Sequence, residues 1–336
     1  MRHNHRLALP KILALALVVF ASATAFAADA GASMKDNMLP VPVENGFSMP
    51  GYYLWCPSVI KVGDTYHLFA SRWPASAGMG GWTSLSECVR ATSKNLLGPY
   101  KFEEVVLQKR PKPAWDNSRV HNVKIVKSGD TYVLYYINSA NETGYAWSKS
   151  ITGPWTRCDA VAMKGSNPAI LVRPDNSIYV MNRWSVTDKT TNKQFNRAIV
   201  FLAKTFNSPY EVQNNSENVL PNNAELEDPC IWWANNQYNI LVNDWNAKAT
   251  GTQKAGAQYF SKDGIHYTLM SKTPVFTKDI TYADGAKETL ARRERPFIYV
   301  NEKGEAIALF TACLPKGGGD ARIIAQPIKP YTPDNK

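Results

Sequence analysis

The chain has 336 residues, with 38 Lys and Arg against 28 Asp and Glu, which gives a formal net charge of +10. A charge of this size concerns solubility and association rather than fold, and most of it is ordinary solvated surface. Beyond the N-terminal segment, no stretch approaches the ~20 apolar residues that a membrane-spanning helix needs. The sequence therefore excludes a protein built from transmembrane helices.

The N-terminus has the pattern of a secretory signal peptide. Arg2, Arg6 and Lys11 precede a short apolar run over residues 12–20, and Ala25-Phe26-Ala27 is a small-x-small cleavage site. We therefore predict a signal peptide over residues 1–27 and a flexible segment over 28–38. The mature protein is expected in the periplasm or outside the cell, where nucleic acid is not an expected partner. Its moderately basic charge suits acidic or sulfated glycans.

Five cysteines enter this oxidising compartment. Their spacing matches no zinc-binding signature, and their odd number leaves at least one thiol without a partner in the chain. The sequence does not assign pairs. They are Cys56, Cys88, Cys158, Cys230 and Cys313.

One hairpin pattern recurs along the rest of the chain, and internal repeats of this kind indicate propellers or solenoids. In the first copy, residues 55–62 are followed by the turn Gly63-Asp64 and by a second apolar run over 65–69. Two apolar segments joined by a two-residue turn predict a β-hairpin. Further copies begin at residues 121, 167, 227 and 294.

A second signature follows the hairpin and predicts a third and a fourth strand. Gly98-Pro99-Tyr100, Gly153-Pro154-Trp155 and Ser208-Pro209-Tyr210 each lie after such a third strand. Repeated four-stranded sheets bury one another's faces, as the blades of a propeller do. We predict an all-β fold, a five-bladed β-propeller with four antiparallel strands per blade, over residues 39–336. An irregular β-sandwich accounts for the strands but not for the recurring Pro-aromatic motifs that follow each third strand.

The first residues of the five innermost strands are expected to face one central cavity. The position before the motif proline, which is replaced by Val123 in the second copy, is occupied in turn by Cys56, Asn122, Asn167, Asp228 and Arg295. Three long loops, over residues 72–88, 184–197 and 244–257, are further sources of site residues. Trp82 or Trp245 in these loops is expected either to stack on a sugar ring or to pack between blades.

The repeated motif resembles the five-bladed glycoside hydrolases of family 43 and their relatives in families 32, 117 and 130. In that superfamily an Asp begins blade one as general base, a second Asp begins blade three, and the general acid lies in a Glu-x-Pro motif. Glu227-Asp228-Pro229 matches the acid motif, so the resemblance implies that Glu227 is the general acid. Cys56 and Asn167 occupy the two aspartate positions, so the usual inverting mechanism is not implied.

Glycoside cleavage uses two carboxyl groups, one to protonate the leaving oxygen and one to activate water or attack the sugar. Glu294 precedes Arg295-Pro296 at the same motif position as Glu227, and some family 43 galactanases are similar in using Glu-Arg-Pro. Glu294 is therefore the candidate second carboxylate, or alternatively a partner of Arg295 or Arg293 in an ion pair. Asp228 is the alternative candidate for the general base.

Other candidates rest on residue type alone. His121 is a candidate general acid or base. Alternatively, it hydrogen-bonds a sugar hydroxyl, or it is a structural residue of the inner strand whose ring nitrogens are hydrogen-bonded within the protein. Arg119 is suited to a carboxylate or sulfate. Cys56 is either a thiolate nucleophile or, more simply, a buried thiol or half of a disulfide. The predicted substrate-binding set is Trp55, Cys56, Arg72, Asp116, Arg119, Asn122, Asn167, Arg183, Asp244, Trp245 and Arg295.

We therefore predict an exo-acting glycoside hydrolase for a plant or algal oligosaccharide. Arg72, Arg119, Arg183 and Arg295 indicate an anionic sugar. A non-catalytic carbohydrate-binding propeller and a glycoside phosphorylase are the alternatives. No metal ligands and no cofactor are predicted. An axial calcium ion is left open, although no dense carboxylate loop indicates one. The sequence does not predict the oligomeric state.

Overall fold

A computed structural model describes residue 1 and residues 33–332, apart from 139, 188 and 215–218. The predicted signal peptide lies outside the described residues. Among the helices that are described, none is long and apolar enough to cross a membrane.

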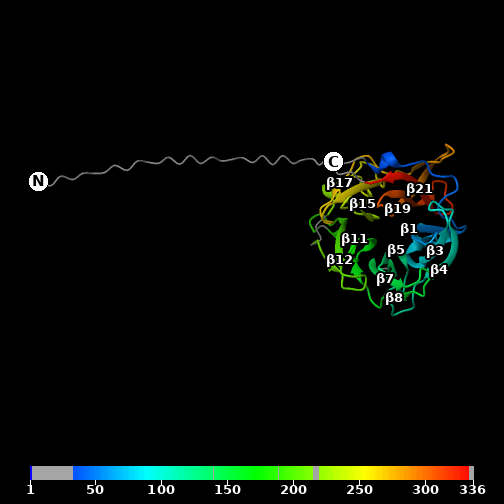
Figure 1. Cartoon of the computed structure of the whole chain (residues 1–336), viewed down its shortest axis with the longest axis horizontal. Helices are drawn as coiled ribbons and strands as arrows, with labels where there is room; N and C mark the ends of the chain where they lie inside the picture. The colour runs from blue at the N-terminus through cyan, green and yellow to red at the C-terminus, as the bar shows by residue number, and fades with distance from the viewer. Residues whose placement is uncertain (2–32, 139, 188, 215–218, 333–336) are drawn as a thin grey trace.

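The described chain forms five antiparallel β-sheets arranged as blades around a central axis (Figure 1), which confirms the predicted all-β propeller. Blade one contains β1 (Tyr52–Val62), β2 (Thr65–Pro74), β3 (Glu87–Ser93) and β4 (Lys101–Leu107). Blade two contains β5 (His121–Ser128), β6 (Thr131–Ile137), β7 (Glu142–Ser148) and β8 (Thr156–Arg157), and the short β9 (Met163–Lys164) also pairs with β7.

The remaining blades follow in chain order. Blade three contains β10 (Ser166–Val172), β11 (Ile178–Thr187), β12 (Gln194–Ala203) and β13 (Glu211–Val212). Blade four contains β14 (Cys230–Ala234), β15 (Gln237–Asn243), β16 (Gly256–Ser261) and β17 (Thr268–Leu269). Blade five contains β18 (Asp279–Thr281), β19 (Lys287–Val300), β20 (Ala306–Pro315) and β21 (Arg322–Tyr331).

In the part of the chain that the structure describes, helical structure is confined to short pieces outside the blades. These are η1 (Met34–Asn37), η2 (Ala75–Ala77), η3 (Met79–Gly81), α1 (Trp82–Leu85) and η4 (Pro221–Asn223).

The inner hairpins turn where the sequence predicts. Gly63 and Gly129 have φ of 56° and 59°, and the Asn235-Asn236 turn has φ of 53° and 54°. Two-residue hairpin turns need positive φ, which Gly and Asn adopt most easily. The turn chemistry therefore fixes the register of the strands that lead into the centre.

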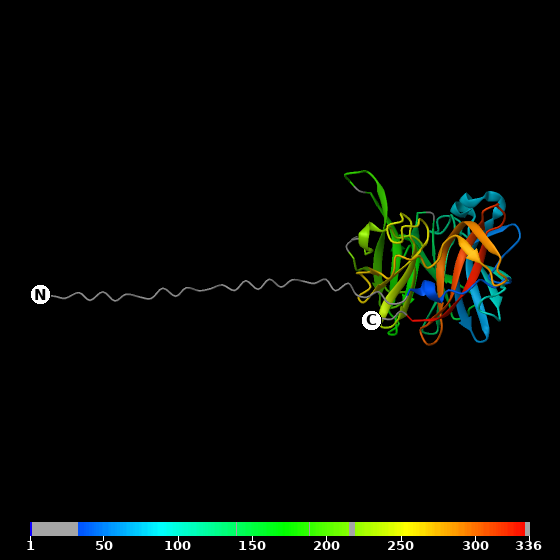
Figure 2. The same cartoon turned by 90° about the horizontal axis from the view of Figure 1, so that it is seen from above.

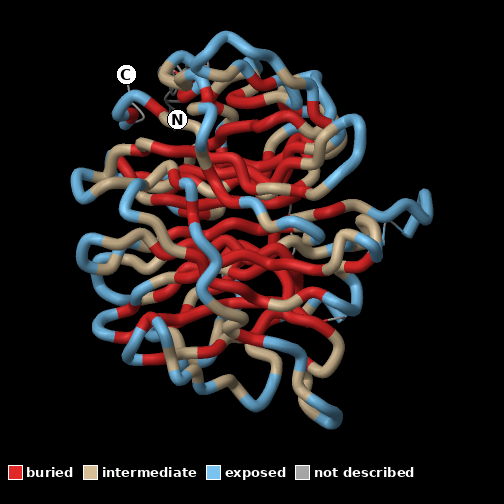
Figure 3. Tube along the Cα trace, turned by 90° about the vertical axis from the view of Figure 1, so that its right-hand side faces the viewer, coloured by how far each residue is buried: buried red, intermediate tan, exposed pale blue. Residues whose placement is uncertain are grey.

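The hydrophobic core lies between blades rather than in one central mass. Five clusters of buried side chains each join two neighbouring sheets, as Val133 of β6 and Ile170 of β10 do between blades two and three. Figure 3 shows these buried strands stacked through the molecule with exposed connections at the edges. Each sheet thus buries both faces only because its neighbours are present.

The ring is closed by the N-terminal segment, which lies along the last blade. Met38 and Phe47 form antiparallel bridges with Ile328 and Ile323 of β21. Met34 in η1 is fully buried in the cluster shared by blades four and five. The flexible segment predicted over 28–38 is therefore wrong for residues 33–38, because their apolar side chains and backbone groups find partners on the neighbouring blades.

Two of the three predicted long loops carry regular structure. β11 and β12 continue as a paired ribbon as far as Thr187 and Gln194, so residues 184–187 and 194–197 form the two strands of a projecting hairpin rather than a loop. Residues 75–85 form η2, η3 and α1. Figure 2 shows the green hairpin and these blue-cyan helical turns rising from the same face of the propeller.

All five cysteines are free, and four of them are buried. The expected unpaired thiol is therefore present, and Cys56 is a buried thiol rather than half of a disulfide.

Candidate active site

The same position in all five blades has a left-handed backbone. Cys56, Asn122, Asn167, Asp228 and Arg295 have φ of 56°, 54°, 53°, 53° and 57°. Four of the five inner strand pairs also lose regular register around this residue. Positive φ is uncommon for non-glycine residues other than Asn and Asp, and its recurrence marks a constrained site.

These five residues converge on the propeller axis, as the sequence predicts. Together with Lys124 and Pro229 they line one small axial cavity of about 10 Å³. This volume is at the lower limit for a single water molecule. The side chains therefore contact one another at the base of the site and leave little room for a ligand there.

A chain of hydrogen bonds links four blades around the axis. The Cys56 thiol donates to Asn122 Oδ1 at 3.1 Å, and the Asn122 amide donates to Asn167 Oδ1. Asn167 Nδ2 then donates to Glu227 Oε1 at 2.7 Å and to Asp228 Oδ1 at 3.0 Å. Cys56 and Asn167 are thus thiol and amide members of a network that ends on the carboxylates of blade four.

Asp228 is held by charged and neutral donors. Its carboxylate lies 2.5 Å from Arg295 Nη1 and accepts from Asn243 Nδ2 at 2.8 Å and from the Arg295 amide at 3.2 Å. Its exposed fraction is 4%. Although burial opposes it, the Asp228 carboxylate raises the pKa of Arg295 above its ordinary value. Asp228 and Arg295 therefore form a buried ion pair that joins blades four and five.

Glu227 lies next to this pair in a nearly buried position. Its Oε2 is 2.7 Å from Arg183 Nε and accepts from Asn196 Nδ2 at 3.3 Å. Burial, followed by the charge of Asp228, raises the pKa of Glu227 to about 7, although Arg183 and Arg295 oppose the shift. A carboxyl group with this pKa exchanges its proton near neutral pH.

Glu294 occupies the equivalent position in blade five. Its Oε1 lies 3.4 Å from Arg292 Nη1 and 3.6 Å from Lys254 Nζ, and the ammonium of Lys254 lies 4.5 Å from the Trp245 ring centroid. Burial and Asp228 raise the pKa of Glu294, and the nearby cations oppose this. Both glutamates therefore lie in the fields of the same Asp228 and Arg295 charges. The ion pair expected with Arg293 or Arg295 is instead made with Arg292 and Lys254.

His121 is enclosed by protein contacts. Its Nδ1 lies 2.9 Å from Ser86 Oγ, its Nε2 lies 3.7 Å from Cys56 Sγ, and its ring stacks on Trp82 at 4.9 Å. Burial, together with the charges of Arg295 and Arg119, holds the pKa of His121 well below its ordinary value. The ring is therefore neutral and part of the packed wall of the site.

Several predicted sugar-binding residues are engaged elsewhere. Asp116 is fully buried between Arg110 and Arg157, at 2.6 and 2.9 Å, and Arg72 pairs with Glu87 at 2.8 Å. Trp55 is buried against Trp73. Their roles in sugar binding stay predictions, and residue type alone does not show that a local partner already engages the side chain.

Asp244 and Arg119 also have structural partners. Asp244 accepts hydrogen bonds from the backbone amides of Ala249 and Thr250, so it holds the loop that follows β15. Arg119 is buried, lies 4.4 Å from the Trp82 ring centroid and donates to Asn141 Oδ1 at 2.9 Å. Trp82 thus packs on protein groups, whereas Trp245 lies beside the Lys254–Glu294 pair.

The structure adds site residues that the sequence interpretation missed. Lys124 follows Asn122 by two residues on β5 and lines the same axial cavity. This spacing was the available signal. Lys254, Arg292, Asn196 and Asn243 come from a loop or from other strands, and no motif links them to the axis.

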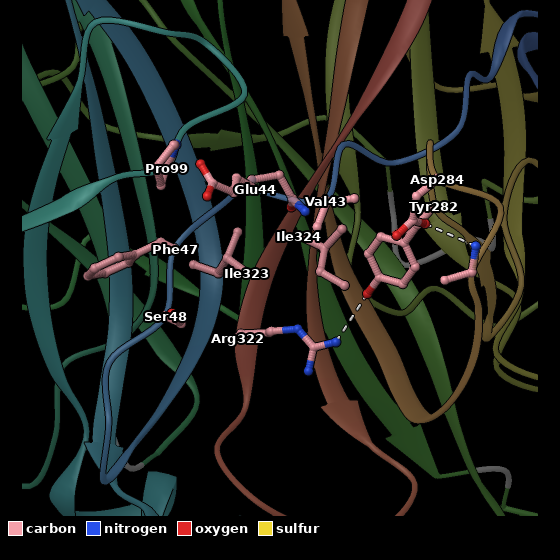
Figure 4. A pocket seen from close by; sticks show the side chains of 12 residues that line it. Val43, Glu44, Phe47, Ser48, Pro99, Tyr282, Asp284, Arg322, Ile323 and Ile324 are labelled. Carbon is pink, nitrogen blue, oxygen red and sulfur yellow. Dashed lines mark hydrogen bonds between the residues drawn. The ribbon is translucent and has the colours of Figure 1, made fainter.

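A large groove on the described surface lies away from the axis. It has a volume of about 690 Å³ and is lined by residues of the N-terminal segment, β21 and the turn after β18. Figure 4 shows Arg322 pointing to Tyr282 across this groove. Arg322 also pairs with Glu288 at 2.6 Å, so its charge is compensated within the blade.

Across the described residues, no three His, Cys, Asp or Glu side chains are grouped as ligands for a metal ion. The expectation that no cofactor is needed stays a prediction.

The fold and the axial residues define a five-bladed propeller with a carboxylate-containing site at its centre. Solved structures share this fold. One is a protein solved as a complex with RGII, with a TM-score of 0.69 and 12% identity over 90% of this chain and 97% of the matched protein. Another is a thermostable family-43 glycoside hydrolase, with a TM-score of 0.60 and 12% identity over 89% and 98% of the two chains.

A third structure is a family 117 glycoside hydrolase from the marine bacterium Zobellia galactanivorans, with a TM-score of 0.59 and 15% identity over 86% and 92% of the chains. No family model and no curated protein matches the sequence. Identities this low show a common fold and nothing finer. The predicted resemblance to families 43 and 117 is confirmed at that level.

Proposed function

We propose that this chain is a glycoside hydrolase in which Glu227 is the general acid and Glu294 is the second carboxylate. The observation that carries the proposal is the pair of nearly buried glutamates at equivalent positions of neighbouring blades, both influenced by Asp228 and Arg295. Structural neighbours that are glycoside hydrolases support the same class of reaction.

The environments of the two glutamates suit different roles. Glu227 has a pKa of about 7 and one facing arginine, so a substantial fraction carries the proton that a departing sugar oxygen needs. Glu294 faces two cations, Arg292 and Lys254, which favour its ionised form. An ionised Glu294 activates water or attacks the anomeric carbon, while Glu227 protonates the leaving group.

Asp228 and His121 act differently in this proposal from their first assignments. Asp228 is fully occupied by Arg295, Asn167 and Asn243, so it is a positioning residue rather than the base. His121 is neutral and enclosed, and supports the wall of the site.

We further propose that the enzyme acts outside the cytoplasm on an oligosaccharide from plant or algal matrix glycan, releasing sugars from a chain end. The N-terminal sequence of basic residues, apolar run and small-residue cleavage site supports export. The axial cavity at the base of the site, which is only about 10 Å³, supports recognition of a chain end rather than a continuous chain.

The test is sugar release from a panel of neutral and acidic oligosaccharides by the wild type and by Glu227→Gln. We expect the substitution to lower turnover at least a hundredfold, within the usual range for loss of a general acid. Glu211→Gln, an exposed glutamate on β13, is the matched control and should leave turnover unchanged.

Each reaction is run with and without inorganic phosphate. Release that requires phosphate and yields a sugar phosphate would reassign the chain to the phosphorylases. Binding of glycan without any release would identify a carbohydrate-binding propeller.

A further inference from the structure

The charges around the two glutamates are not balanced. Glu227, Asp228 and Glu294 face four cations, and the charge of Arg295 also acts on two further cationic residues, Arg119 and Lys124. The six cationic residues are Arg119, Lys124, Arg183, Lys254, Arg292 and Arg295. The axial site thus has more positive than negative groups, and the surplus grows when Glu227 is protonated.

The surplus is most accessible on the Glu294 side. The side chains of Lys254 and Arg292 have exposed fractions of 26% and 38%, whereas that of Arg295 is 15%. Their contacts with Glu294 Oε1, at 3.6 and 3.4 Å, are longer than the 2.7–2.9 Å of a strong charge-assisted hydrogen bond. Both cations therefore keep hydrogen-bonding capacity for a ligand.

The two groups come from different parts of the fold and meet at one carboxylate. Lys254 lies in the loop between β15 and β16, and Arg292 lies on β19. Half-buried Trp245 lies beneath the Lys254 ammonium. Asp244 fixes this loop by accepting hydrogen bonds from Ala249 and Thr250. The ammonium is thus held at the mouth of the site rather than free on a mobile chain.

We propose that Lys254 and Arg292 form a subsite for an acidic sugar, one that carries a carboxylate or a sulfate group, next to the bond that is cleaved. This inference rests on the proposed function, because the subsite is defined by its distance from Glu294. An anion bound here compensates the excess positive charge of a site with little room for water, which a neutral sugar does not do. Arg292 supplies planar paired donors and Lys254 a compact point charge.

The test measures equilibrium binding by calorimetry to Glu227→Gln, which holds ligand without cleaving it. The probes are an oligouronate and its methyl ester, and a sulfated oligosaccharide and its desulfated form. We expect one acidic probe to bind at least about tenfold more tightly than its neutral counterpart. A ratio of this size corresponds to the free energy of one charge-assisted hydrogen bond. The uronate and sulfate pairs identify which anion the subsite takes.

In the same background, Lys254→Gln and Arg292→Gln are each expected to abolish the preference, measured in each variant as the ratio of the acidic to the neutral affinity. Lys248→Gln, an exposed lysine of the same loop, is the matched control and should keep the preference. Thermal unfolding of each variant confirms that the fold is retained. Equal affinity for both acidic probes and their neutral forms would overturn the subsite. Absence of sugar release by the wild type, with the acidic preference intact, would instead overturn the proposed hydrolysis.

Discussion

At the scale of single residues, the environment of each carboxylate decides its role more than its place in a motif. Glu227 and Asp228 are adjacent in sequence, yet Asp228 is neutralised by Arg295 whereas Glu227 has a pKa of about 7. Burying a carboxylate next to another negative charge favours its protonated form. In the proposed mechanism, one motif therefore supplies both a proton donor and an anchor for the neighbouring arginine.

The pKa of Glu227 predicts the pH dependence of hydrolysis. Because a general acid works in its protonated form, kcat/KM should fall as pH rises through about 7. The measurement is the pH profile of kcat/KM on a substrate with a poor leaving group. A profile that stays flat between pH 5.5 and 8.5 would remove Glu227 from the acid role.

The Asp228–Arg295 pair predicts a stability effect. Asp228→Asn leaves a buried guanidinium without its counter-charge, so we expect a loss of roughly 3–5 kcal/mol in the free energy of unfolding. Urea denaturation measures it. Asp130→Asn, which breaks the exposed pair with Lys149, should cost far less, because solvent screens that pair. Equal losses in the two variants would contradict an anchoring role for Asp228.

At the scale of elements, the hairpin turns were predictable because they depend on local chemistry. Gly63-Asp64 and Asn235-Asn236 specify turns from their own conformational preferences. The left-handed residues that open each blade were not predictable as such, because Cys56 and Arg295 have no preference for positive φ. Their conformation is imposed by the surrounding strands. Likewise, only tertiary structure brings Lys254 and Arg292 to Glu294.

The loop after β15 gives a prediction at this scale. Asp244→Ala removes the acceptor for the amides of Ala249 and Thr250, so we expect a loss of about 1–3 kcal/mol and a looser loop around Lys254. Limited proteolysis should cleave the variant within residues 245–255 faster than the wild type. Asp263→Ala, which affects a turn in the outer part of the same blade, should leave this cleavage rate unchanged. Protection equal to the wild type would show that Asp244 does not hold the loop.

At the scale of the whole molecule, the repeated pattern predicted the number of blades, but no sequence feature indicated how the ring closes. The N-terminal residues show no hairpin motif, and they were expected to be loose. Their partners, Ile323 and Ile328 of β21, are distant in sequence, and pairing between such distant segments leaves little local signature. Closure therefore depends on contacts between the two ends of the domain, without a disulfide.

Met34 tests this closure. Met34→Ala opens a cavity in the cluster between blades four and five, so we expect a loss of about 2–5 kcal/mol, seen as a lower Tm. Val43→Ala, at a position 60% exposed in the same segment, should change stability by roughly 0.5 kcal/mol or less. If both variants have the same Tm as the wild type, the N-terminal segment does not stabilise the closed ring.

The two-carboxylate site is tested most directly by comparing Glu227→Gln and Glu294→Gln on aryl glycosides whose leaving groups differ in basicity. A dinitrophenolate leaves without protonation, so we expect Glu227→Gln to retain much of its activity on that substrate and to lose it on a phenyl glycoside. Glu294→Gln should lose activity on both, because the attacking or base function is needed in each case. Undiminished turnover of the dinitrophenyl glycoside by Glu294→Gln would contradict the proposed site.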